Sequence, residues 1–136
     1  MLEIKPIQSK EIQRELAGRC NVDYAPEAFA YSAYEGDRFL GMSQFTIEDG
    51  YALIINISHA SDSDDEEAMF IMGRAVLNFL DLCKVTVCRI NSNAASRNLI
   101  LKIGFHSETE KSDGTPSYLP LTLTGMFDAK CHPHNK

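Results

Sequence analysis

Short blocks of alternating apolar and polar residues predict strands in the first half of the chain. Tight turns rich in Gly, Asp and Glu separate the later blocks, which favours a meander of antiparallel strands. The last block is almost entirely apolar, as expected of a central strand covered on both faces. The predicted strands are Leu2–Ile7, 28–34, 39–47 and 51–57.

Apolar residues at helical spacing predict two helices between and after these strands. The first begins at Ser9, which has the right chemistry for an N-cap, and ends near residues 18–21. The second follows Ser63, whose spacing from Glu66 has the form of a capping box. Its apolar stripe continues to Cys83.

The remaining third of the chain predicts a strand at 84–90, a helix at 93–103 and two last strands at 105–110 and 117–124. Gly104 suits the position just past a helix end. A strand, helix and strand in succession imply parallel pairing. The predicted fold class is therefore α/β, a mixed α+β sheet of order β-α-β-β-β-α-β-α-β-β, mostly antiparallel with one parallel strand pair.

The 136 residues suit a single domain, which we place at 1–125, followed by a polar tail at 126–136. The net charge of −6 argues against a nucleic-acid partner, because phosphate binding needs clustered Lys and Arg. No apolar run is long enough for a membrane span, and the start lacks a signal-peptide core. The four cysteines show no paired spacing and read as reduced thiols of a cytoplasmic protein.

Residues 93–105 read Asn-Ala-Ala-Ser-Arg-Asn-Leu-Ile-Leu-Lys-Ile-Gly-Phe. This stretch resembles the second signature of the GNAT acyl-CoA-dependent N-acetyltransferases, an Asn, a short helix and a Lys-x-Gly-Phe ending. The resemblance covers residues 1–124 in element order and about 53–105 in sequence character. It implies the GNAT fold and acyl transfer to the amine of a small molecule or peptide. It also implies acetyl-CoA or another acyl-CoA as the cofactor.

GNAT enzymes hold the cofactor pyrophosphate at a helix N-terminus with a loop of the form Arg/Gln-x-x-Gly-x-Gly/Ala, since free amides and the positive helix end attract an anion. Only Gly73 matches this loop, and Ala68 and Ile71 stand at its other positions. The resemblance assigns Ile57, Ser58, Gly73 and Asn93 to cofactor binding. A plain N-cap is the alternative for Asn93.

The segment 62–67 holds five carboxylates where the family has its phosphate cradle: Asp62, Asp64, Asp65, Glu66 and Glu67. The first interpretation is a well-capped surface helix. The second is a divalent cation that bridges these carboxylates to phosphate. No other pattern in the sequence predicts a metal site.

A general base must take a proton from the acceptor ammonium, and His59, just past the central strand, is our candidate for that catalytic role. Glu67 is the weaker candidate. Many family members place a tyrosine, as general acid for the CoA thiolate, at the position that Ile100 occupies here. Isoleucine has no proton to give.

Two functions follow from these observations. One is an N-acyltransferase with an altered phosphate site, and the other is a catalytically inactive GNAT-fold binding or dimerisation module that does not bind CoA. The acidic segment discriminates between them. The short first connection has room for one helix where the family has two, so we also expect an open cleft or a homodimer.

Overall fold

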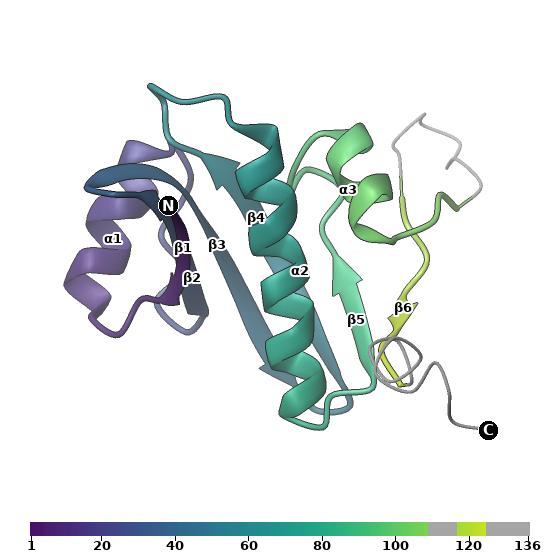
Figure 1. The fold of residues 1–136 in the computed structure, drawn as a ribbon. Helices are drawn as coiled ribbons and strands as arrows, with labels where there is room; N and C mark the ends of the chain where they lie inside the picture. The colour runs from purple at the N-terminus through teal and green to yellow at the C-terminus, as the bar shows by residue number, and fades with distance from the viewer. Residues whose placement is uncertain (109–116, 125–136) are drawn as a thin grey trace, which may run out of the picture.

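The computed structural model describes residues 1–108 and 117–124. These two ranges hold three helices and six strands (Figure 1). In chain order they are β1 (Leu2–Pro6), α1 (Lys10–Arg19), β2 (Phe29–Glu35), β3 (Arg38–Glu48), β4 (Tyr51–His59), α2 (Glu66–Leu82), β5 (Val87–Ile90), α3 (Arg97–Ile103) and β6 (Leu121–Thr122).

The strands form one sheet in their sequence order, β1-β2-β3-β4-β5-β6. The pairing of β4 with β5 is parallel and every other pairing is antiparallel. Helix α2 joins the two parallel strands, since parallel neighbours need a crossover connection. The predicted mixed sheet with one parallel pair is confirmed.

The helices cover both faces of the sheet. On one face, Leu16 and Ala17 of α1 pack with Phe39 and Met42 of β3. On the other face, α2 and α3 pack on a larger apolar cluster that includes Phe45. Side chains of a strand alternate between faces, which is why β3 contributes to both clusters. In Figure 1, α2 crosses the sheet while α1 lies near its β1 edge.

The first helix begins as predicted, with the Ser9 hydroxyl accepting from the amide of Ile12 at 3.3 Å. The predicted capping box at Ser63 is wrong. Asp65 is the N-cap of α2, and its carboxylate accepts from the amide of Ala68 at 3.0 Å. The amide of Ser63 donates instead to the carbonyl of Ala60 in a turn, so the helix starts later.

The helix predicted from Asn93 begins instead at Arg97, and its N-cap is Ser96. Residues 91–95 are held out of the helix because Ala94 is bonded to β4: its carbonyl accepts from the amide of Ile57 at 2.9 Å. The N-cap alternative for Asn93 is therefore wrong. The predicted stop is confirmed, with Gly104 at φ 138°.

The two predicted last strands are mostly replaced by irregular chain within the described residues. The segment ending at Glu108 meets the segment beginning at Ser117 through a single bridge, Ser107 with Tyr118. Only Leu121–Thr122 forms a strand, so the described order has one strand fewer than predicted. Residues 109–116 and the predicted tail at 126–136 lie outside the described residues.

Gly41 of β3 lies against β4 and α2. A Cβ there would stand 2.5 Å from the carbonyl oxygen of Ser58 and 2.6 Å from the Cε atom of Met69. Because a backbone oxygen does not move cheaply, only glycine lets β3, the end of β4 and the start of α2 approach this closely.

We therefore expect Gly41→Ala to destabilise the fold by about 1–3 kcal/mol, the usual cost of overpacking a core. Gly18→Ala is the matched control, since no atom lies within 4 Å of a Cβ there. In a helix that control should stabilise by about 0.5–1 kcal/mol. Urea unfolding of both variants measures the difference, and equal stabilities would contradict the close approach.

Candidate functional site

A β-bulge in β4 opens the site. Gln44 pairs with Asn56 and Phe45 pairs with Ile54, so Ile55 has no partner on β3. The parallel pairing of β4 with β5 covers only residues 52–54 and ends at this point. A bulge bends its strand and increases the local twist, and β4 therefore leaves β5 after Ile54.

The loop 91–96 runs along the part of β4 that β5 leaves. The amide of Asn91 donates to the carbonyl of Ile54 at 3.1 Å, and the amide of Ile57 donates to Ala94. Two cavities flank this loop, and both include Asn93 in their walls. We call them together the cleft.

The first cavity has a volume of about 280 Å³ and lies toward the α2 start; its walls include Cys20, Ile57, Ser58, His59, Glu66, Met69, Asn93 and Leu99. The second has a volume of about 390 Å³ and lies toward the end of α1; it is lined by Asn21, Val22, Asp23, Ile55, Asn56, Asn91 and Asn93.

The structure brings four of the five predicted site residues into the wall of the first cavity: Ile57, Ser58, His59 and Asn93. Their chemical roles stay predictions. Sequence reasoning missed Asp23, and it treated Glu66 only as part of the acidic segment. No local signal identifies Asp23, because its place in the cleft depends on how the end of α1 meets β4.

Gly73 lies outside the walls of both cavities. It is buried where α2 meets α3, and a Cβ there would stand 2.5 Å from Cδ1 of Ile103 and 3.3 Å from Cδ1 of Ile57. This contact accounts for the glycine by helix packing, without any ligand.

His59 is an exposed residue in the wall of the first cavity, and its ring contacts the backbone. Its Nδ1 lies 2.9 Å from the carbonyl oxygen of Ala60. A carbonyl only accepts, so Nδ1 holds the hydrogen and the neutral ring keeps the lone pair on Nε2. A lone pair on an imidazole nitrogen is the chemistry that a general base requires.

A buried amide network holds the floor of the cleft. Gln44 of β3 accepts from Nε2 of Gln13 at 2.9 Å, and its own Nε2 donates to Oδ1 of Asn56 at 2.9 Å. Asn56 in turn donates to the hydroxyl of Ser58 at 3.0 Å. Buried amides joined in this way specify one arrangement, because an unpaired member is costly.

Gln44 also fixes the chain after α1. Its Nε2 donates to the carbonyl of Asp23, and its Oε1 accepts from the amide of Ala25, both at 2.9 Å. Asn21 adopts φ 58°, a conformation that Asn tolerates better than most residues. Together these contacts hold residues 21–25 at the edge of the second cavity.

Cys20 lines the first cavity, where its thiol donates to the carbonyl of Ser58 at 3.5 Å. Burial raises the pKa of this thiol to about 11. The thiolate is the nucleophilic form of cysteine, so Cys20 is protonated and unreactive near neutral pH. Burial therefore disfavours Cys20 as a nucleophile at that pH.

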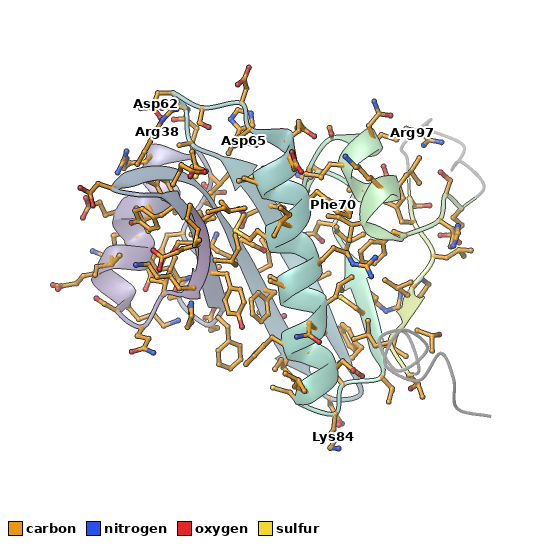
Figure 2. All side chains as sticks on the ribbon, in the orientation of Figure 1. Arg38, Asp62, Asp65, Phe70, Lys84 and Arg97 are labelled. Carbon is orange, nitrogen blue, oxygen red and sulfur yellow. The ribbon has the colours of Figure 1, made fainter. Side chains whose placement is uncertain are left out.

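The start of α2 does not fit a diphosphate. The Asp65 carboxylate already caps the helix, and Glu66 and Glu67 occupy the first turn. Figure 2 shows Arg38 and Arg97 at the same end of the molecule, yet Nη2 of Arg38 donates to the carbonyl of Asp62. No Lys or Arg lines either cavity in the described part of the chain. An incoming diphosphate would meet like charges and few free amides.

Two further observations concern the rest of an acyl-CoA. The amide of Ile57, on the strand edge that β5 leaves open, is already bonded to Ala94. Ile100, at the family's acid position, is fully buried in the core. The site therefore has a cavity lined by His59, without the family's phosphate loop at the start of α2 and with isoleucine at the position of the family's tyrosine.

Within residues 1–108 and 117–124, no group of three or more His, Cys, Asp or Glu side chains is placed to hold a metal ion. The cation interpretation of the acidic segment thus has no support there. Among the described helices, none has the length and apolar content needed to cross a bilayer.

No protein-family model and no curated protein matches the sequence. Solved structures do match. The ribosomal-protein-S18-alanine N-acetyltransferase of Escherichia coli is similar with a TM-score of 0.67 at 14% identity, over 90% of this chain and 94% of that one. A protein from Desulfovibrio desulfuricans described as an acetyltransferase of the GNAT family has a TM-score of 0.64 at 13% identity, over 90% of this chain and 99% of that one. The chain has the GNAT fold.

Two more GNAT-fold enzymes extend the comparison. The PaiA N-acetyltransferase of Thermoplasma acidophilum, solved with coenzyme A, has a TM-score of 0.67 at 11% identity, over 90% of this chain and 99% of that one. A variant of the spermidine N-acetyltransferase of Vibrio cholerae has 0.68 at 9%, over 95% and 98%. At such low identities the structural similarity establishes the fold alone. The chemistry of the site has to be argued from the residues of the cleft.

The burial of the cysteines predicts their reactivity. Burial raises the pKa of Cys20 to about 11 and that of Cys88 to about 12, so both stay protonated at pH 8, whereas Cys83 is exposed. Iodoacetamide at pH 8 should alkylate Cys83 and leave Cys20 and Cys88 intact until urea is added. Peptide mass spectrometry reads the sites, and alkylation of Cys20 in the folded protein would contradict its burial.

Proposed function

We propose that this protein is N-acetyltransferase-like and transfers an acyl group to an amine bound in the cleft. The observation behind the proposal is the cavity at the β4 bulge, whose walls include both His59 and Glu66. The acyl donor of this proposal is an acyl-CoA, as for GNAT-fold proteins in general, one of which was solved with coenzyme A.

An ammonium group must lose a proton before it attacks a thioester. In the proposed reaction His59 takes that proton through Nε2, and Glu66 on the same cavity wall holds the ammonium in place. Glu67, the weaker candidate base, is not part of either cavity wall. Since Ile100 has no proton to give, the leaving group is protonated by solvent.

The misfit at the start of α2 favours a second candidate function. In this reading the cleft is a binding site of a catalytically inactive GNAT-fold module that does not bind CoA. Two observations favour it. The Asp65 carboxylate caps the helix end that a diphosphate would bind, and the amide of Ile57, which a cofactor arm would use, is already bonded to Ala94.

Calorimetric titration with two donors separates the candidates. S-acetylpantetheine lacks the diphosphate of acetyl-CoA, so the first proposal predicts that it binds at least as tightly as acetyl-CoA. Magnesium should leave both affinities unchanged. If neither donor binds at concentrations up to millimolar, the acyltransferase proposal fails and the inactive binding module is the function that stands.

The variant Asp65→Ser tests the repulsion directly, because serine keeps an N-cap while removing the charge. Combined with Glu67→Gln, it should tighten acetyl-CoA binding about 30-fold and leave S-acetylpantetheine unchanged, since each of the two partly exposed like charges costs on the order of 1 kcal/mol. Glu48→Gln, at the β3–β4 turn, is the distant control. An equal gain for both donors would argue against charge repulsion.

His59→Ala should lower kcat/KM for acyl transfer about 100-fold if His59 is the base. His106→Ala is the matched control, since His106 is exposed and lines neither cavity. Thiol release monitored across an amine panel measures both variants. Equal activities for His59→Ala and the unmodified protein would remove His59 from the mechanism.

The proposal also includes a cytoplasmic location and a homodimer. The single helix α1 leaves one side of the cleft without the second helical wall usual in the family, and a second copy would supply it. Light scattering at rising concentration measures this association.

A further inference from the structure

The amide network at the cleft has a fixed direction, which Gln44 sets. The two ends of its side-chain amide face backbone groups that cannot exchange roles. Its Oε1 accepts from the amide of Ala25, and its Nε2 donates to the carbonyl of Asp23, both at 2.9 Å. A reversed Gln44 amide would place an N–H against an N–H and an oxygen against an oxygen. These contacts therefore allow only one orientation.

The direction passes from Gln44 to Asn56. The Nε2 of Gln44 donates to Oδ1 of Asn56 at 2.9 Å, so Nδ2 of Asn56 faces away from Gln44. This Nδ2 lies 3.5 Å from the carbonyl oxygen of Met42, which can only accept, and 3.0 Å from Oγ of Ser58. Because Asn56 is buried, a reversed amide would lose these partners without water to replace them.

Ser58 therefore accepts the last hydrogen bond of the network. A hydroxyl has one hydrogen, and the hydrogen of Ser58 meets no acceptor within residues 1–108 and 117–124. Ser58 is half-buried and belongs to the wall of the first cavity, which also includes His59. An acceptor atom that enters this cavity can thus be the missing partner of the Ser58 hydroxyl.

The proposed reaction brings such an acceptor, the carbonyl oxygen of the thioester. This oxygen gains negative charge as the amine attacks, and donors that are already in place stabilise it best. The amide of Ile57, a backbone donor of this part of β4, is already bonded to Ala94. Asn93 and Ser96 also line the first cavity, but both are exposed. Ser58 is the hydroxyl of this wall that a buried network orients.

We propose that the Ser58 hydroxyl donates to the carbonyl oxygen of the acyl group, and that Asn56 positions it for this role. The amine nitrogen bonds to the carbonyl carbon while the π pair moves to the oxygen, which accepts from Ser58. The oxygen then re-forms the double bond, the C–S bond breaks, and the thiolate leaves with its electron pair. His59 holds the proton of the ammonium, and Ser58 keeps its own. The inference rests on the proposed function for the acyl donor.

Ser58→Ala removes the donor and should lower kcat about 100-fold, while KM changes less than about threefold. Ser58→Thr keeps the hydroxyl and should restore most of the rate. The pH profile of Ser58→Ala should match that of the unmodified protein, because His59 is untouched. Ser32→Ala is the matched control, since it removes a buried hydroxyl that donates to the backbone and lines neither cavity. An unchanged kcat in Ser58→Ala would overturn the proposal.

Asn56→Asp tests the direction of the network. A carboxylate accepts from Gln44 and from Ser58 alike, so the Ser58 hydrogen turns from the cavity to the new carboxylate. We expect kcat to fall about 100-fold, and no further in combination with Ser58→Ala. Asn56→Ala is the second variant, because it adds no buried charge; it releases the hydroxyl and should also cost nothing beyond Ser58→Ala. Additive losses would overturn the positioning role of Asn56, and thermal melts identify which variants fold.

The infrared spectrum of bound S-acetylpantetheine, isotope-labelled at its carbonyl carbon, reports the contact without turnover. A hydrogen bond weakens the C=O bond, so the band should move to higher wavenumber in Ser58→Ala and stay in place in Ser58→Thr and Ser32→Ala. A band that moves in this way, in protein that acylates no amine, supports the Ser58 contact and removes the enzyme. Acyl transfer at an unchanged rate in Ser58→Ala supports the enzyme and overturns the inference. If no acyl donor binds, both are overturned.

Discussion

The β-bulge at Ile55 is the constraint on which the site depends. It ends the pairing of β4 with β5 after three residues, so the last part of β4 presents its edge to the loop 91–96 instead of to a strand. The loop bonds to that edge at Ile54 and Ile57, and the cavities lie on either side of it. The bulge, the end of the β4–β5 pairing and the two cavities thus lie at the same part of β4.

The amide network converts this opening into a defined shape. Gln13, Gln44 and Asn56 join α1, β3 and β4 through hydrogen bonds that are almost wholly shielded from solvent. Because a buried amide without partners is costly, the network resists rearrangement and holds residues 21–25 beside the bulge. The network thereby connects α1, the single helix on its side of the cleft, to β3 and β4.

Electrostatics distinguish this cleft from the phosphate cradle that the GNAT fold usually builds at the same place. Asp65 caps α2 with a carboxylate, so the helix end is satisfied by the protein itself. The charges that disfavour a diphosphate favour an ammonium.

The sequence alone determined the properties that depend on near neighbours. Alternating apolar and polar residues, with turn residues between them, predicted the antiparallel meander. The succession of strand, helix and strand predicted the single parallel pair. The predicted N-cap at Ser9 and the predicted helix end at Gly104 are also confirmed. The family resemblance and the order of the predicted elements also named Ile57, Ser58, His59 and Asn93 as site candidates. The structure places all four in the wall of one cavity.

Only the tertiary structure decided what depends on distant contacts. Asn93 is outside α3 because Ala94 bonds to β4, and Gly73 lies where α2 packs closely on Ile103 of α3. The β3–β4 register shift that leaves Ile55 without a partner is likewise a tertiary feature, which no local pattern encodes. The periodicity of apolar residues shows which side of a helix or strand is buried. The composition of a site depends on which helices, strands and loops come together, and only the tertiary structure shows that.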